Sequence, residues 1–363
     1  MTSNNAIQVR YELQRGDFGL DVDLELPLRD ISGVLGASGA GKTSLLRCIA
    51  GLERPASGKL LVADEIWQDS SAGIWRDAHE REVGYVFQEP RLFPHLDVRG
   101  NIEYGRRRCR HRTAKNLDQI VALLGLENLL RRNTAELSGG EAQRVAIARA
   151  LACAPRFVLM DEPLASLDQA RKDEILPFLD RLHVESDIPI IFVSHNIDEV
   201  CRLCDHLVVI ENGRVAASGD LQSVLVNADA QLLAGDQASS VIHGTALSYD
   251  ENDDITRLQF SGGELWVPGR AAADGAELRL RVRASDVSLC RIRAEQSTIL
   301  NILPAVVESI RDDSGPAALV RVLLGETSIL SRVTRRSVRE LNLQQGDEVF
   351  AQIKSVAVRP SIT

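Results

Sequence analysis

A glycine-rich segment between residues 36 and 43 has the residue types and the spacing of a phosphate-binding loop. It follows an apolar, β-branched run at Ile31–Leu35, and a helical pattern begins at Lys42. Glycines let the backbone curl so that its N–H groups point at phosphate oxygens, and the following helix adds the positive end of its dipole. The lysine can reach the β- and γ-phosphates, and the threonine supplies a hard oxygen for Mg²⁺. The candidate ATP-binding residues of this loop are Gly36, Ala37, Ser38, Gly39, Ala40, Gly41, Lys42 and Thr43.

Two carboxylates end a second apolar run, in which Phe157–Met160 is followed by Asp161 and Glu162. In α/β proteins, ligands bind at the carboxyl ends of parallel strands. We predict that Asp161, together with Thr43, holds Mg²⁺ through its water shell. Glu162 is then placed to orient and polarise the water that attacks the γ-phosphate. These residues predict a nucleoside triphosphatase.

The segment Leu137–Glu141 precedes AQRVAIARAL, whose apolar spacing predicts a helix capped by Ser138. The glycine N–H groups and the helix dipole at this end favour an anion. The segment resembles the signature of the ABC ATPase family, and the resemblance covers residues 1 to about 230. It implies that the signature of one chain closes over the γ-phosphate held by a second copy, so that the chain works as a homodimer. The signature residues are Ser138, Gly139, Gly140 and Glu141.

Further positions match this family one by one. Gln88 corresponds to the glutamine that senses Mg²⁺ or the attacking water for the membrane partner. His195 corresponds to the switch histidine that contacts the γ-phosphate, and the resemblance implies that His195 and Glu162 are the catalytic residues. Ser166 and Asp168 correspond to the loop that communicates across the dimer.

Two aromatic residues, Tyr11 and Phe18, precede the phosphate loop and could stack on the adenine base. Either ring could equally belong to the core. We favour Phe18.

The elements that position these residues alternate between short β-branched runs and longer helical patterns, which predicts a parallel sheet covered by helices. The expected architecture is an α/β phosphate-loop NTPase (ABC ATPase) domain with a helical insert, followed by a small all-β, OB-like barrel domain. The predicted boundaries are 1–230 for the ATPase domain, with the helical part at about 89–155, then 231–244 for a linker and 245–363 for the β domain, with its barrel at about 290–363.

Three segments mark the tail of the chain: Leu280–Leu289, Ser297–Asn301 and Ala351–Val358. With them, the tail from about residue 290 resembles the molybdate-binding barrel found in small molybdate-storage proteins and at the end of molybdate importer ATPases. Hydroxyl, amide and ammonium groups suit a tetrahedral dianion. Ser297, Asn301, Lys354 and Ser355 are therefore the candidate oxyanion residues. A Leu300-Asn301 pair stands where storage proteins carry Arg-Asn. The barrel could instead serve only to join two subunits.

The resemblance implies the ATPase of a bacterial molybdate importer, using ATP and Mg²⁺, with molybdate also a candidate ligand of the barrel. Its implied partners are a second copy, two transmembrane permease subunits and, indirectly, a periplasmic molybdate-binding protein. The implied location is peripheral, at the cytoplasmic face of the inner membrane. The alternatives are an importer ATPase for sulfate, iron or sugars, a soluble ABC ATPase, and a molybdate store or sensor.

Composition agrees with this reading. A net charge of -9 and a pI near 5.4 argue against broad nucleic-acid binding. The longest apolar stretches fall far short of the roughly 20 residues of a membrane span, and the N-terminus lacks the apolar core of a signal peptide. The basic run Arg106–Arg112 is either a solvated loop or a site for an anionic partner. Cys201 and Cys204 have metal or redox spacing without a second pair beside them.

Overall fold

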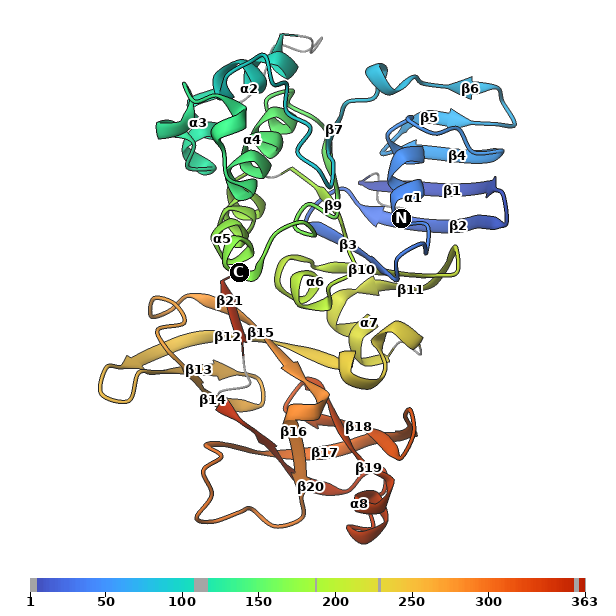
Figure 1. The fold of residues 1–363 in the computed structure, drawn as a ribbon. Helices are drawn as coiled ribbons and strands as arrows, with labels where there is room; N and C mark the ends of the chain where they lie inside the picture. Colours follow the sequence, from blue (N-terminus) through green and yellow to red (C-terminus); the bar gives the residue numbers. More distant parts are fainter. Residues whose placement is uncertain (1–4, 108–116, 187, 228–229, 356–358, 363) are drawn as a thin grey trace. The chain divides into compact units, whose positions relative to one another are not determined.

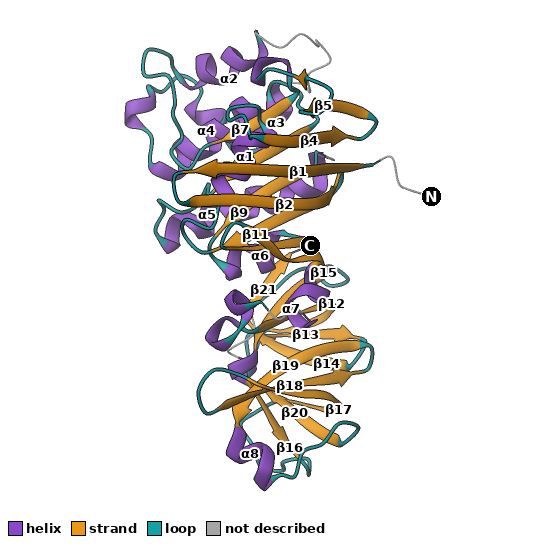
Figure 2. Ribbon diagram, turned by 90° about the vertical axis from the view of Figure 1, so that its right-hand side faces the viewer, coloured by secondary structure: helices purple, strands orange, loops and turns teal. Residues whose placement is uncertain are grey.

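Two compact units, Met1–Gly219 and Asp220–Thr363, make up the computed structural model, which describes residues 5–107, 117–186, 188–227, 230–355 and 359–362 (Figure 1). The first unit combines helices with a large sheet, and the second is built mostly of strands (Figure 2). Within the described ranges, no helix has the length and apolar character that crossing a membrane requires. The part of the arginine run that follows Arg107 lies outside the described residues.

A single 11-stranded sheet forms the centre of the first unit. Five neighbouring strands, β10-β3-β9-β8-β7, pair in parallel, whereas β6-β5-β4-β1-β2 pair in antiparallel fashion. Every residue of β3, β8 and β9 is buried, as expected for parallel strands covered on both faces, and the three predicted strands are confirmed. In sheet order the strands are β6 Ile74–Trp75, β5 Glu65–Asp69, β4 Ser57–Val62, β1 Ala6–Arg15, β2 Phe18–Pro27, β11 Arg214–Asp220, β10 His206–Glu211, β3 Ile31–Gly36, β9 Ile190–Ser194, β8 Phe157–Asp161 and β7 Val83–Val86.

The predicted helical insert is present between β7 and β8. Helix α2 packs on α4, and α3 packs on α4 and α5 (Figure 1). The apolar face predicted for α3 is buried, including Leu117, Ile120, Val121 and the following Leu124. The helices of this unit are α1 Lys42–Ile49, α2 Val98–Arg106, α3 Leu117–Leu123, α4 Gly139–Leu151, α5 Gln169–Ser186 and α6 Ile197–Leu203.

The second unit holds two five-stranded antiparallel sheets, β14-β13-β12-β15-β21 and β16-β20-β17-β18-β19. Apolar side chains of both sheets, among them Leu280 and Val320, belong to one hydrophobic core. The elements are α7 Leu221–Asn227, β12 Ser239–Asp250, β13 Ile255–Phe260, β14 Gly263–Pro268, β15 Glu277–Arg283, β16 Val287–Cys290, β17 Asn301–Asp312, β18 Ala317–Leu324, β19 Thr327–Thr334, α8 Arg335–Glu340, β20 Glu348–Ile353 and β21 Arg359–Ile362.

The predicted linker at 231–244 is wrong, because this segment belongs to the second unit and includes the first half of β12. Its serines made it resemble a loop, yet both are buried and bonded. The guanidinium of Arg281 donates to Ser239 Oγ at 2.8 and 3.1 Å, and Ser240 Oγ accepts from the Leu330 backbone N–H at 2.9 Å. With their polar atoms satisfied, these serines fit a buried strand. The boundary between the units lies at residue 219 rather than 230.

Arg81 fixes the far end of helix α1, whose first residue is Lys42. Its buried guanidinium donates to the carbonyl oxygens of Cys48 and Ile49 at 2.8 and 2.7 Å, and to that of Arg76 at 2.9 Å. A positive charge at the carboxyl end of a helix is favourable, and the donors satisfy carbonyls that the helix leaves unpaired.

Replacing Arg81 with Met should lower the free energy of unfolding by at least about 2 kcal/mol, because buried carbonyl oxygens lose their donors. Denaturant unfolding of the full chain measures this change. Arg10→Met is the control: the ion pair of Arg10 with Asp23 is exposed to solvent, so its loss should leave the unfolding midpoint unchanged. Equal midpoints for wild type and Arg81→Met would contradict the assignment.

Candidate functional site

The phosphate loop joins β3 to α1, and two of its glycines lie so close to their neighbours that a side chain would not fit. Gly41 has φ +105°, and a Cβ there would lie 2.8 Å from the Phe18 ring. A Cβ on Gly36 would lie 2.8 Å from the Ile210 carbonyl oxygen. A side chain at either position would push the loop away from the sheet and from helix α1.

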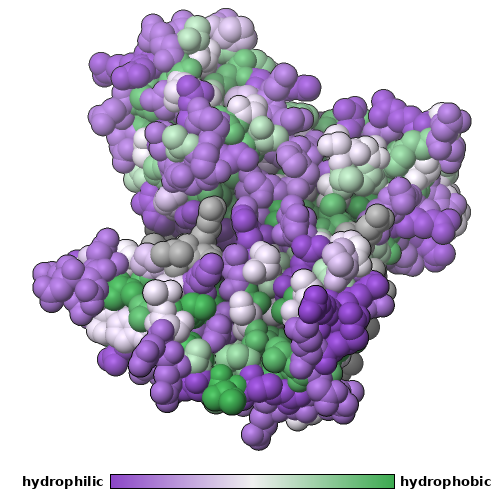
Figure 3. Space-filling view, turned by 60° about the horizontal axis from the view of Figure 1, so that its bottom comes forward, coloured by the Kyte–Doolittle hydropathy of each residue, from purple (hydrophilic) through white to green (hydrophobic). Residues whose placement is uncertain are grey.

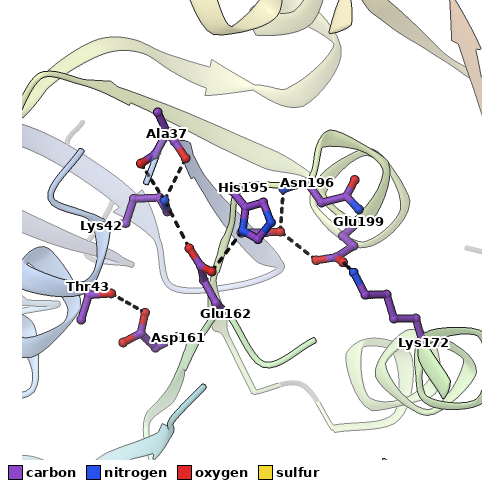
Figure 4. A network of polar contacts seen from close by, with 11 residues as sticks. Ala37, Lys42, Thr43, Asp161, Glu162, Lys172, His195, Asn196 and Glu199 are labelled. Atoms are coloured by element: carbon purple, nitrogen blue, oxygen red, sulfur yellow. Dashed lines mark hydrogen bonds and ion pairs between the residues drawn. The ribbon is translucent and has the colours of Figure 1, made fainter. Parts of the chain in front are cut away.

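Lys42 is enclosed by the loop that it follows. Its side chain is 4% exposed, and Nζ donates to the carbonyl oxygens of Gly36 and Ala37 at 2.8 and 3.0 Å (Figure 4). Nζ also lies 3.3 Å from Glu162 Oε1, which joins the loop to the end of β8. The remaining loop residues, Ser38, Gly39 and Ala40, form the turn between Ala37 and Gly41.

Asp161 occupies the last position of β8 and is nearly buried. Thr43 Oγ1 donates to its Oδ1 at 2.9 Å, and Tyr85 OH donates to its Oδ2 at 3.0 Å. Burial raises the pKa of the Asp161 carboxyl, and the two hydrogen bonds oppose that rise. Burial also raises the pKa of Tyr85, so that this phenol stays protonated and donates. A carboxylate and a hydroxyl side by side are the hard oxygen ligands that Mg²⁺ prefers, so these residues fit the predicted metal.

Glu162 follows Asp161 with a left-handed backbone, φ +47°. Its Oε1 faces Lys42, while its Oε2 lies 3.0 Å from His195 Nδ1 (Figure 4). A carboxylate only accepts hydrogen bonds, so His195 is the donor in this pair. The structure therefore brings Lys42, Glu162 and His195 together, although Lys42 and His195 are 153 positions apart in the sequence. Their meeting follows from the order of the parallel strands, since β3, β8 and β9 end at the same edge of the sheet.

Of the two candidate adenine-stacking aromatics, Tyr11 is excluded by burial, because no part of it is exposed. Phe18 is half-buried, and its ring lies 2.8 Å from where a Cβ on Gly41 of the loop would stand. Phe18 thus stays as the candidate for the base.

The signature begins helix α4 with the predicted cap. Ser138 Oγ accepts from the Glu141 backbone N–H at 3.3 Å, and Glu141 Oε2 accepts from the Ser138 backbone N–H at 2.7 Å. This capping box leaves the backbone of Gly139 and Gly140 at the positive end of the helix. The hydrogen bond from the Ser138 N–H lowers the pKa of Glu141.

Of the remaining predicted positions in the first unit, Gln88, Ser166 and Asp168 are exposed, whereas the two cysteines are buried. Gln88 lies beyond the end of β7, the strand next to β8 in the sheet. Ser166 and Asp168 precede helix α5, where Asp168 Oδ1 accepts from the Arg171 backbone N–H at 2.9 Å. Cys201 and Cys204 are buried at the end of α6, and Cys204 packs so closely on Gly33 that a Cβ there would lie 2.8 Å from its sulfur.

In the second unit, the prediction for Asn301 needs correction. Its amide ties β17 to β14, because Oδ1 accepts from the Trp266 N–H at 2.7 Å and Nδ2 donates to the Trp266 carbonyl at 3.0 Å. The second Nδ2 hydrogen goes to Ser355 Oγ at 3.2 Å. With both donors used and the residue 1% exposed, Asn301 is a structural residue here.

The other three oxyanion candidates keep donors. Ser297 lies in the exposed loop before β17, and its Oγ accepts from the Ile299 N–H at 3.1 Å, which leaves its own proton to donate. Ser355 Oγ accepts from Asn301 Nδ2 at 3.2 Å, and its proton has no acceptor among the residues that the structure describes. Lys354 is exposed beside it. Residues 356–358, part of the tail that resembles the molybdate barrel, lie outside the described residues.

Sequence reasoning missed Tyr85, Lys172, Ser194 and Glu199, all of which belong to the polar network around the site. Tyr85 could have been found, since β7 and β8 pair in parallel with Tyr85 opposite Leu159, two residues before Asp161. No pattern in the sequence indicates that Glu199 turns inward from α6.

Comparison with known proteins agrees with this geometry. A family model described as ABC transporter matches residues 20–165, and one described as TOBE domain matches residues 297–360, which contain β17 to β20. The molybdenum import ATP-binding protein ModC of Methylococcus capsulatus is 50% identical over 353 residues, covering 97% of this chain and 99% of that protein. ModC 1 of Azotobacter vinelandii is 48% identical over 356 residues, covering 98% and 99%. Among solved structures, cbiO1 from Clostridium perfringens, part of the ABC transporter complex cbiONQ, matches with a TM-score of 0.52 and 29% identity over 62% of this chain and 92% of its own.

The Lys42→Ala variant should bind ATP at least about 10-fold more weakly, because a charged donor to a phosphate is worth roughly 1.5–3 kcal/mol. Calorimetric titration of the full chain with ATP measures the affinity. Lys59→Ala is the matched control, since Lys59 is exposed on β4. Identical affinities for all three proteins would refute the role of Lys42.

Proposed function

This chain belongs to the family of molybdenum import ATP-binding proteins, and from that membership we propose that it is the ATP-hydrolysing subunit of an ABC importer that carries molybdate into the cytoplasm. The meeting of Lys42, Glu162 and His195 at one edge of the sheet is the observation that carries the enzymatic part. A phosphate-binding lysine beside a carboxylate suits hydrolysis of the terminal phosphate bond.

In the proposed reaction, the loop N–H groups and Lys42 hold the phosphates and offset the negative charge that develops on them. Glu162 accepts a hydrogen bond from the attacking water and aligns it, while the hydrogen bond from His195 keeps the carboxylate in place. Thr43, Asp161 and Gln88 would hold Mg²⁺, which when bound neutralises phosphate charge. Phe18 would stack on the adenine.

We propose that two copies complete the site. The capping box at Ser138 leaves the positive end of α4 with two small glycines, a suitable surface for the γ-phosphate of a second copy. Ser166 and Asp168 would communicate across this dimer. The dimer would act on two permease subunits at the cytoplasmic face of the inner membrane, supplied by a periplasmic molybdate-binding protein.

Glu162→Gln should bind ATP normally but hydrolyse it roughly 10²–10⁴-fold more slowly, because the amide cannot act as a general base. Steady-state phosphate release gives the rate, and sedimentation in ATP should show an accumulated dimer. Glu12→Gln is the control on the exposed face of β1. Turnover near the wild-type rate in Glu162→Gln would reject this assignment.

For the second unit, we propose that the TOBE domain binds molybdate and that binding inhibits ATP hydrolysis. The supporting observations are the donors kept by Ser297 and Ser355 and the position of Lys354, the only lysine after residue 219. An anion inhibits only if it binds the resting arrangement better than the closed one, and coupling energies of about 1–3 kcal/mol make such inhibition partial and saturable.

A second role is favoured by the exposed apolar residues of the same domain. Ile292 and Leu300, in the loop before β17, are 82% and 57% exposed, and apolar residues interrupt the polar surface in Figure 3. Such residues could join two TOBE domains without binding anion.

In the transporter reconstituted with its permease, molybdate should reduce wild-type ATPase activity, and Lys354→Ala should relieve the inhibition without changing the rate in molybdate-free buffer. Arg336→Ala on exposed α8 is the control, and sulfate tests selectivity. A flat molybdate titration of the wild type would leave the domain with the joining role alone.

A further inference from the structure

A second network of polar side chains lies beside the site and links helix α5 to Ser194, the last residue of β9 and the neighbour of His195 (Figure 4). Lys172 Nζ on α5 donates to Glu199 Oε1 on α6 at 2.7 Å. The other carboxylate oxygen, Glu199 Oε2, accepts from Ser194 Oγ at 2.7 Å. Ser194 Oγ in turn accepts from the backbone N–H of Asn196 at 3.0 Å. The Ser194 hydroxyl thus makes two hydrogen bonds: it donates to the Glu199 side chain, and it accepts from the backbone of Asn196, the residue after His195.

This hydrogen-bonded network is largely buried. The side chains of Lys172 and Glu199 are 15% and 8% exposed, and Ser194 is 2% exposed. An ion pair out of water gains little net stability over apolar residues of the same size, whereas removing one partner is costly. Stability alone is therefore a weak reason for placing this pair here. Each Glu199 oxygen has a donor, so the pair is geometrically defined.

The same pair reaches the segment before α5. The Lys172 backbone N–H donates to the Asp168 carbonyl at 3.0 Å, and Asp168 Oδ1 caps the first turn of the helix. Lys172 therefore lies in the first turn of α5, bonded to the segment that contains Ser166 and Asp168. A displacement of this segment would therefore shift Lys172 and, through its bond to Glu199, also Ser194.

We propose that Lys172, Glu199 and Ser194 form a positioning network that holds His195 against Glu162 and ties it to the segment Ser166–Asp168. The proposal rests on the ATPase function proposed above. Within the described residues, the three side chains bond to one another and to the Asn196 N–H, so we treat them as positioning residues that act through His195. A dimer contact at the exposed Ser166 or Asp168 would by this route adjust the histidine.

A second bridge between the same helices provides a matched control. Arg202 Nη2 on α6 lies 2.8 Å from Asp180 Oδ2 on α5, with side chains 26% and 11% exposed. It joins α5 to α6 as Lys172 and Glu199 do, but Ser194 is bonded to Glu199 and to Asn196, not to this bridge. If the network only fastened the helices together, breaking either bridge would have the same effect.

The first test compares ATPase kinetics of the full chain. Ser194→Ala should lower kcat by about 10-fold or more with little change in KM for ATP, because a small misplacement of a catalytic group costs up to roughly 100-fold. Ser194→Thr keeps the hydroxyl and should retain the wild-type kcat. Arg202→Met should lower Tm without lowering kcat. A loss of kcat in Arg202→Met equal to that in Ser194→Ala, or full activity in Ser194→Ala, would overturn the proposal.

The ion pair is tested without risking the fold. Lys172→Met or Glu199→Leu alone leaves a buried charge unpaired, whereas the double variant Lys172→Met/Glu199→Leu removes both charges and should recover most of the wild-type Tm. Its kcat should stay low, since Ser194 has lost its acceptor. Recovery of kcat together with Tm would show that the pair has only a structural role.

Epistasis with His195 gives the sharpest test. In a His195→Ala background, Ser194→Ala should cause no further loss of the residual rate, because the residue through which it acts is gone. A further 10-fold loss would contradict the proposal. An inactive wild-type chain would instead count against the proposed ATPase function, so the two failures are distinguishable.

Discussion

The arrangement of this protein's chemistry depends on one constraint, that parallel strands end together at one edge of their sheet. Strands β3, β9 and β8 are neighbours, so the loops that follow them converge although they are far apart in the chain. That edge receives the phosphate loop, the Asp161–Glu162 pair and His195. Because the strands are buried on both faces, packing fixes their positions. The polar side chains just beyond the strand ends are therefore held in defined positions as well.

Around this edge, buried charge is tolerated because each group is paired. Lys42 bonds to two carbonyl oxygens and faces Glu162, and Asp161 accepts from two hydroxyls. Lys172 and Glu199, farther from the site, are paired in the same way. An unpaired charge in these places would cost several kcal/mol, so the network is satisfied as a whole or not formed.

The second unit solves a different problem, the closure of two small sheets over one core. Its polar residues serve this task, as Asn301 does by bonding both backbone groups of Trp266 and as Ser239 does by accepting from Arg281. A residue whose type suits anion binding can thus serve instead to hold strands together. Among the described residues, the donors that stay available are those of Ser297 and Ser355, which lie outside the strands β17 and β20.

The sequence by itself determined the phosphate loop, the strand-end carboxylates, the cap of α4 and the helical insert, because each is encoded by local spacing and by residues that have few alternative uses. It misjudged the segment 231–244 and Asn301, since a serine or an asparagine reads as a loop residue or a ligand until its partners are known. Only the tertiary structure decided that Tyr11 is core, and that Glu199 turns inward to Ser194 and Lys172. The physical reason is that local spacing fixes backbone form, whereas the partner of a polar side chain is chosen by whichever distant segment the fold brings within hydrogen-bond distance.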